Sequence, residues 1–209
     1  YTPIIVTFEN YATVLSSYGA FPTQQFRVGL GQSNISKDGR LIFSCNGFHI
    51  YNDTGAVVEN GSYIVPHKFV DKEQVCRRPQ FSIILPKKDN QFYVFTTGMS
   101  DARYDIIDSG GEFVFDLLLY NVVDMNANNG QGKVIAKSNE LITNGRMSAN
   151  SMTACKHANG RDWWLIKPEY SKQIYYTYLV TPEKINEVMI QDMGGDTLSG
   201  GNWGSQHFI

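Results

Sequence analysis

Short turn-forming residue pairs recur along this 209-residue sequence and limit the length of any one secondary-structure element. An Asn-Gly or Asp-Gly pair readily adopts the positive φ angles that tight hairpin turns require. Such pairs occur at Asp38-Gly39, Asn46-Gly47, Asn60-Gly61, Asn129-Gly130, Asn144-Gly145 and Asn159-Gly160. The chain is therefore expected to fold into many short strands joined by tight turns.

Runs of strand length, rich in β-branched and aromatic residues, lie between these turns. They span residues 40–44, 92–97, 113–123, 163–166 and 174–180. Such runs predict antiparallel strands and an all-β fold. A short helix is predicted only over residues 182–189, because Pro182 could occupy its first position.

Several of these runs are apolar on both sides of the strand. In residues 175–180 both the odd-numbered and the even-numbered side chains are mostly aromatic or aliphatic. A sheet with one solvated face needs polar residues on that face, whereas stacked sheets bury their strands on both sides. The pattern favours a β-propeller, in which small antiparallel sheets stack around an axis.

A repeated scheme of strand end, polar turn and aromatic strand supports this interpretation. It begins near Ser36, Pro86 and His157, positions that are 50 and 71 residues apart. Propeller blades usually repeat every 40 to 50 residues or so. The repeat predicts blade-like units at residues 31–80, 81–150 and 151–209, the last with the start of a fourth unit. The longer middle unit is expected to hold its extra residues in a loop from Ser100 to Gly111.

About three blades make an incomplete ring, since propellers typically close with about 4 to 8 blades. The sequence therefore predicts a partial β-propeller, a fragment of a larger protein. Residues 1–30 form an N-terminal segment to which the repeat assigns no role.

Composition excludes several classes of protein. The chain has 18 Lys and Arg against 20 Asp and Glu, and 42% of its residues are hydrophobic. Balanced charge does not favour nucleic acid as a partner, because phosphates are held by clustered Lys and Arg. The apolar content excludes a disordered chain. No transmembrane segment is expected, because the apolar runs are far shorter than the roughly 20 residues that span a bilayer.

Five segments occur in a colinear order that is similar to a known group of proteins. They are residues 35–47, residues 50–52 with 59–61, residues 83–96, residues 119–134 and, most specifically, residues 152–166. This order resembles secreted, propeller-like proteins of Bacteroidota that the type IX secretion system exports. The resemblance implies an extracellular or cell-surface location and half of a propeller from a larger protein, and it implies no known activity.

The segment from His157 to Trp164 gathers the residue types that most suggest chemistry. A catalytic His157–Asp162 pair is one interpretation. The structural interpretation is that His157 and Asp162 hydrogen-bond across the turn while Trp164 packs in the core, since buried polar groups need partners. We favour the structural one. No Ser or Cys lies in a Gly-x-Ser-x-Gly turn, so a hydrolase triad lacks its nucleophile.

Two further sets of residues are candidates for binding. Trp163 and Tyr170 could form part of a sugar-stacking surface, with packing between blades as the alternative. Asp124, Asn126 and Asn128 offer oxygen atoms at alternate positions, as calcium prefers, and the alternative is a polar hairpin loop. An EF-hand is excluded because Ile135 occupies the position of its bidentate glutamate. No other cofactor is expected.

The three cysteines are too few and too scattered for a zinc site. In the oxidising setting that the resemblance implies, we expect Cys45 and Cys76 to form a disulfide with a structural role. Cys155 is then expected to be free and buried. Without that setting, three thiols fit a reduced protein equally well.

We therefore expect a secreted or cell-surface β-propeller module that binds or acts as a scaffold in adhesion, attachment or assembly of an extracellular structure. Its expected partners are a protein or glycan on a cell surface, the rest of the same protein, or neighbouring copies. One alternative is a secreted hydrolase of glycosides or peptides with its site at the propeller funnel. The other is an architectural domain of a surface appendage. An enzyme is the less favoured class.

Overall fold

The structure is a computed structural model that describes residues 4–9, 12–17, 32–36, 38–73, 80–148, 150–170 and 173–194. Residues 4–9, 12–17 and 32–35 are described by their backbone. The fold is mostly β and its sheets are antiparallel, as the sequence predicts. No helix in the described ranges has the length and apolar character needed to cross a bilayer.

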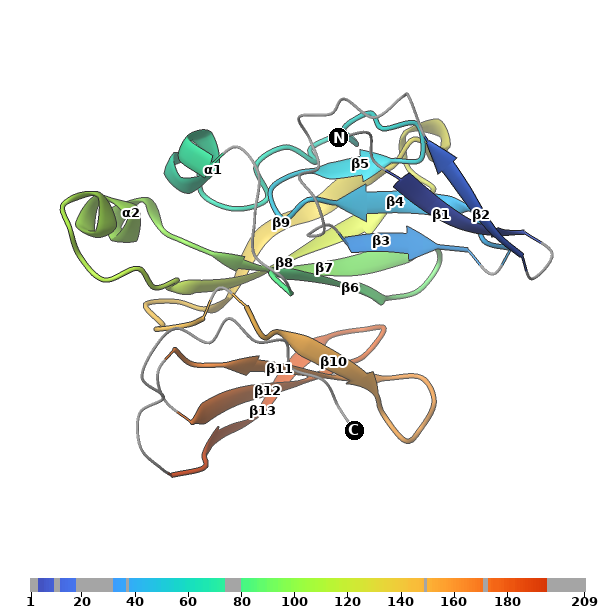
Figure 1. The fold of residues 1–209 in the computed structure, drawn as a ribbon. Coiled ribbons are helices and arrows are strands. Elements are labelled where there is room, and N and C mark those ends of the chain that lie inside the picture. The colour runs from blue at the N-terminus through green and yellow to red at the C-terminus, as the bar shows by residue number, and fades with distance from the viewer. Residues whose placement is uncertain are drawn as a thin grey trace.

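The described strands form four sheets in chain order (Figure 1). A two-stranded hairpin contains β1 (Ile4–Glu9) and β2 (Ala12–Ser17). The first sheet contains β3 (Gln32–Ile35), β4 (Leu41–Cys45) and β5 (Ile50–Asn52). The middle sheet contains β6 (Ser82–Pro86), β7 (Gln91–Gly98), β8 (Leu117–Asp124) and β9 (Lys133–Ile142). The C-terminal sheet contains β10 (Thr153–Lys156), β11 (Trp163–Pro168), β12 (Ile174–Val180) and β13 (Ile185–Asp192).

The repeated scheme found in the sequence falls at the same place in three of these sheets. In each, it is the hairpin turn between the first and the second strand of the sheet. A backbone N–H at the start of each turn donates to a carbonyl oxygen at its end: Ser36 to Arg40 at 2.8 Å, Lys87 to Gln91 at 2.9 Å and His157 to Asp162 at 2.8 Å. Each of the three predicted units thus contains one sheet that begins with the same hairpin.

Two apolar cores separate the three larger sheets. Along β7, Phe92 and Val94 point into the core shared with the first sheet, while Tyr93 and Phe95 point into the core shared with the C-terminal sheet. This alternation follows from the two-residue period of a strand. The middle sheet is therefore buried on both faces, between the other two (Figure 1).

The C-terminal sheet is buried on one face only. Tyr178 and Val180 of β12 belong to the core shared with the middle sheet, and each is 1% exposed. Tyr175, Thr177 and Leu179, on the other side of β12, are half-buried. The sequence predicts that both sides of residues 175–180 are covered. The side with Tyr178 and Val180 is buried, whereas the opposite side is only half-buried.

The short helix predicted over residues 182–189 is wrong. Pro182 lies in the turn between β12 and β13, and residues 185–192 pair with β12 as a strand. The β-branched Ile185, Val188 and Ile190 explain the difference, because such side chains favour a pleated strand over a helix.

Two α-helices among the described residues interrupt the all-β pattern, α1 (His67–Glu73) and α2 (Asp101–Asp108), and a short 3₁₀ helix, η1 (Asn128–Gly130), lies between β8 and β9. Helix α2 occupies the region where the sequence predicts a loop from Ser100 to Gly111. The extra length of the middle unit is therefore used for a helical insertion between β7 and β8.

The connections differ between the two ends of the sheets (Figure 1). One end, which we call the hairpin end, carries the short turns at residues 36–40, 53–56, 87–90, 157–162 and 181–184, together with the loop at 125–132. The other, the long-connection end, carries α1, α2 and the connections at residues 99–116, 143–152 and 169–173. The helices lie at the left in Figure 1 and the β10–β11 turn at the right.

Candidate functional site

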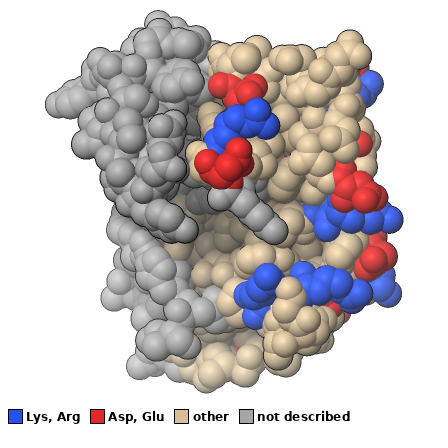
Figure 2. All heavy atoms as spheres, turned by 90° about the vertical axis from the view of Figure 1, so that its right-hand side faces the viewer, with Lys and Arg blue, Asp and Glu red and all other residues tan. Residues whose placement is uncertain are grey.

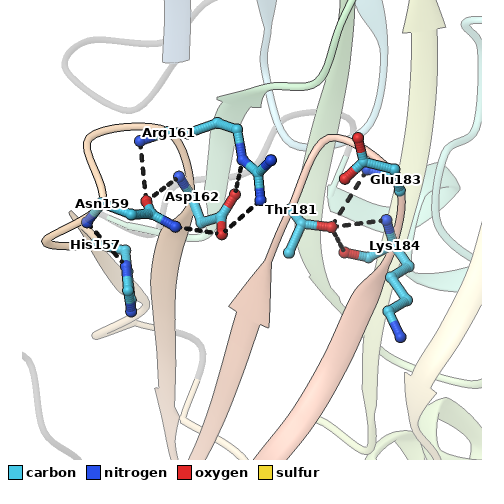
Figure 3. Close-up of polar contacts among 7 residues, drawn as sticks. All are labelled: His157, Asn159, Arg161, Asp162, Thr181, Glu183 and Lys184. Atoms are coloured by element: carbon cyan, nitrogen blue, oxygen red, sulfur yellow. Dashed lines mark hydrogen bonds and ion pairs between the residues drawn. The ribbon is translucent and has the colours of Figure 1, made fainter.

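Residues 157–162, which the sequence singles out, form the hairpin turn between β10 and β11 (Figure 3). Nδ1 of His157 accepts a hydrogen bond from the backbone N–H of Asn159 at 3.1 Å. The bond between His157 and Asp162 across the turn joins their backbones, at 2.8 Å. The His157 ring thus bonds within its own turn rather than to the Asp162 carboxylate.

The Asp162 carboxylate is buried and is held by its neighbours in the turn. Asn159 Nδ2 donates to Oδ2 at 2.7 Å, and the Arg161 guanidinium donates to Oδ1 at 2.8 Å and to Oδ2 at 3.2 Å. The hydrogen bonds from Arg161 and Asn159 hold the pKa of Asp162 below its usual value. Both oxygens are therefore used to close the hairpin.

The neighbouring turn of the same sheet, residues 181–184, is closed in a similar way (Figure 3). Thr181 Oγ1 accepts hydrogen bonds from the N–H groups of Glu183 at 3.3 Å and Lys184 at 3.1 Å. Basic and acidic side chains lie interspersed over the hairpin end, as Figure 2 shows. Among the described residues of this face, charges of both signs therefore lie next to one another (Figure 2).

The structure separates the residues predicted to form a sugar-stacking surface. Trp163, at the start of β11, packs against the core between the middle and C-terminal sheets, with Lys156 Nζ 5.8 Å from its ring centroid. Tyr170 lies beyond the far end of the same strand. Trp164 points to the other face of the sheet, where its half-buried ring lies 5.3 Å from that of His157.

The oxygen atoms of the predicted calcium loop accept hydrogen bonds from the loop itself and from the neighbouring β6–β7 hairpin. Asp124 Oδ2 accepts from Gln91 Nε2 at 3.0 Å, and Oδ1 accepts from the N–H of Asn126 at 2.9 Å. Asn126 Oδ1 accepts from Asn90 at 3.0 Å, and Asn128 is exposed. No cluster of three or more His, Cys, Asp or Glu side chains suited to a metal occurs within the described ranges. The calcium site stays a prediction.

The cysteines do not support the predicted disulfide. Cys45 is a free, fully buried thiol, and its predicted partner Cys76 lies outside the described residues. Burial raises the pKa of the Cys45 thiol to about 11. Cys155 is free and half-buried.

At the long-connection end, α2 is fixed by a buried carboxylate that the sequence could not place. Ser100 caps the helix by accepting from the N–H of Arg103 at 3.0 Å. Asp116 in turn accepts from the N–H of Ser100 at 2.7 Å and from its hydroxyl at 2.5 Å. Gly110, at φ +94°, ends the helix in a conformation that favours glycine. The helix is thus held at both ends.

Two ion pairs join the connections of the long-connection end to one another. Lys68 of α1 lies 2.6 Å from Asp105 of α2, and Arg146 lies 2.8 Å from Glu112. These pairs join α1 to α2, and the 143–152 connection to the 99–116 connection.

A buried lysine of β11 holds the 143–152 connection by hydrogen bonds to its backbone. Lys167 of β11 is 0% exposed, and its ammonium donates to the carbonyl oxygens of Ser148 at 2.6 Å and Asn150 at 2.9 Å. A buried ammonium is costly unless such acceptors surround it. Lys167 therefore fixes the backbone of the 143–152 connection at Ser148 and Asn150.

Next to α1, Tyr63 forms the centre of an aromatic stack. Its ring lies parallel to that of His67, with centroids 4.2 Å apart, and its N–H donates to Nδ1 of His49 at 3.1 Å. Tyr63 has a φ of 51°, which is unusual for a bulky residue. Burial lowers the pKa of His49.

Two apolar side chains of the 99–116 connection are exposed. Ile106 of α2 is 49% exposed and Phe113 is 41% exposed. The Phe113 ring rests on the buried rings of Phe115 and Phe69, at centroid distances of 5.5 and 6.4 Å. A rigid aromatic side chain is thereby presented on a fixed loop.

The sequence analysis did not identify Ile106 and Phe113 as exposed residues. The one signal for this region was the 71-residue spacing between the second and third repeats, which indicates an insertion but not which residues it exposes. A scan against protein-family models, a search of curated proteins and a search of solved structures found no match.

Proposed function

We propose that this chain is a β-propeller module of the cell surface or extracellular space, and that it binds or acts as a scaffold in adhesion, attachment or assembly of an extracellular structure. Three antiparallel sheets that follow one another in the chain, pack face to face and begin with equivalent hairpins support the propeller. The extracellular location rests on the resemblance in the five sequence segments.

The concentration of long, mutually tied connections at one end of the sheets carries the proposed binding role. Binding residues are most often found on loops that a rigid scaffold positions. Here Asp116 and Lys167 fix the connections from within, and Phe113 and Ile106 are exposed on them. We assign the ligand surface to Phe113, Ile106 and the Tyr63–His67 stack.

The chemistry of this surface suits a protein or glycan ligand. An exposed aromatic ring such as that of Phe113 can stack on a sugar ring or anchor a protein contact. The ion pairs Lys68–Asp105 and Arg146–Glu112 provide a polar surround. An apolar centre with a polar rim is the usual anatomy of a binding interface.

The alternative of a hydrolase is less favoured, because carboxylates at the long-connection end are used in contacts that hold the connections together. Three acids of this region are already engaged: Asp105 and Glu112 form ion pairs, and Asp116 holds the cap of α2. These carboxylates therefore position the connections.

Binding of fluorescently labelled protein to intact bacterial cells and to an array of surface polysaccharides tests the proposal. Phe113→Ala should weaken binding by about 10-fold or more if the ring is an anchor. Val57→Ala is the matched control, because Val57 is also 41% exposed but follows the 53–56 turn of the hairpin end. Equal binding by the two variants, or no binding by the unmodified protein, would contradict the proposal.

A further inference from the structure

The outer strand of the C-terminal sheet is the most apolar exposed element that the structure describes. Val188, Met189 and Ile190 of β13 and Met193 just after it are each about half exposed. Among the described residues β13 pairs with β12 only, and no described strand lies along its other edge. Such an edge is a template for pairing with another strand.

The corresponding strand of the middle sheet, β9, is protected. Residue 59 pairs with the start of β9, and Lys133 of β9 lies 2.6 Å from Glu59. Ser138 Oγ donates to the carbonyl oxygen of Ile64 at 3.2 Å, and Ser138 itself has a φ of 51°. The ladder between β8 and β9 also contains three register shifts, which discourage regular pairing.

No comparable cover lies on β13 among the described residues. Its ladder to β12 has one register shift, at Val188, against three in the ladder of β9. Charged residues that usually protect an edge are confined to Glu187 and Asp192, on either side of the apolar centre.

The sequence of β13 is symmetric in polarity about Met189. On one side lie Val188, then Glu187 and Asn186; on the other lie Ile190, then Gln191 and Asp192. Antiparallel pairing of two such strands about Met189 places apolar residues opposite apolar ones and polar residues opposite polar ones. It also opposes no two like charges, which would destabilise a pair of strands.

We infer that β13 pairs antiparallel with β13 of a second copy of this chain, with Met189 on the two-fold axis. Such an interface is self-complementary, since each strand supplies the same residues to the other. The pairing would extend the C-terminal sheet across two molecules and cover Val188, Met189 and Ile190.

Charge variants at Met189 test both the partner and the register. Met189→Lys places two ammonium groups opposite each other across the axis, and Met189→Glu places two carboxylates there. By sedimentation at tens of micromolar, each variant should have the mass of one chain, whereas the unmodified protein should have twice that mass. An equimolar mixture of the two variants should recover the doubled mass.

Ile135→Lys is the matched control, because Ile135 is 49% exposed on the protected edge strand β9. This variant should keep the doubled mass. Circular dichroism of all three variants should match that of the unmodified protein, because Met189 and Ile135 are exposed. A monomeric unmodified protein, or a dimer that Met189→Lys leaves intact, would overturn the inference.

This pairing uses none of the residues assigned to the ligand surface. Loss of dimerisation in Met189→Lys and loss of binding in Phe113→Ala are therefore separate outcomes.

Discussion

The middle and C-terminal sheets have the same topology but different surroundings. Each is a four-stranded antiparallel meander that begins with an equivalent hairpin. In the middle sheet, both faces of β7 are buried between two cores. In the C-terminal sheet, one face of β12 is buried, the other is half-buried, and β13 has a free edge within the described residues.

The difference shows that strand order does not decide how deeply a sheet is buried. The neighbouring layers decide it, because a sheet gains apolar burial only from what packs on it. The middle sheet should therefore be the most stable part of the chain, and the outer face of the C-terminal sheet should tolerate substitution best.

The largest effect is expected in the middle sheet. Phe95 is 0% exposed and lies in the core between the two sheets, so Phe95→Ala should destabilise the protein by about 3 to 5 kcal/mol. Denaturant unfolding measures this. Leu179→Ala, on the half-buried face of β12, is the comparison, and a loss as large as that of Phe95→Ala would abolish the distinction between the sheets.

A smaller loss is expected at the buried lysine of the C-terminal sheet. Lys167→Met keeps the length of the side chain but leaves the carbonyl groups of Ser148 and Asn150 without this donor. We expect a loss of about 2 to 3 kcal/mol in unfolding free energy. Lys156→Met, at an exposed position on β10, should change stability little. Stability unchanged in Lys167→Met would show that the ammonium does not hold the 143–152 connection.

Trp164 distinguishes the two faces of the C-terminal sheet. Because its ring is half-buried, Trp164→Ala should cost about 1 to 2 kcal/mol, below the value for a buried aromatic residue. Thermal and denaturant unfolding of Trp164→Ala and Tyr178→Ala give the comparison, because Tyr178 is 1% exposed on the inner face of the same sheet. A loss at Trp164 as large as the loss at Tyr178 would mean that the outer face is as well packed as the inner one.

The smallest effect concerns the β10–β11 turn and depends on pH. The folded-state pKa of Asp162 is lowered, so the carboxylate stabilises the fold above its unfolded pKa and loses this contribution as the pH falls through the folded value. The stability difference between the unmodified protein and Asp162→Asn should therefore be present at neutral pH and shrink below about pH 4. A difference that is constant down to pH 2 or so would assign the effect to shape rather than charge.

Much of the strand pattern could be predicted from the sequence, because it depends on local chemistry. Residues 174–180 form β12 with the predicted bounds, and the three related turns lie at equivalent hairpins. Residues 182–189 were mispredicted because Pro182 suits a turn as well as a helix start, and the strand is decided by pairing with β12.

The candidate site was less predictable for a physical reason. His157, Asp162 and Trp163 attract attention by residue type, yet their contacts serve a hairpin and a core. Phe113 and Ile106 are ordinary residues in sequence, and they become a surface only because Asp116 and the ion pairs of α1 and α2 fix their loop. The exposure of these two side chains depends on tertiary contacts, which no local sequence pattern predicts.

Hydrogen exchange of backbone amides, measured by mass spectrometry on the Met189→Lys variant, tests the comparison of the two sheets most directly. This variant removes any protection of β13 that comes from a second copy. The account predicts that β7 and β8 exchange slowest, through global unfolding, while β13 exchanges much faster through local opening. Equal protection of β13 and β7 would show that the C-terminal sheet is buried as fully as the middle one, and would contradict the account.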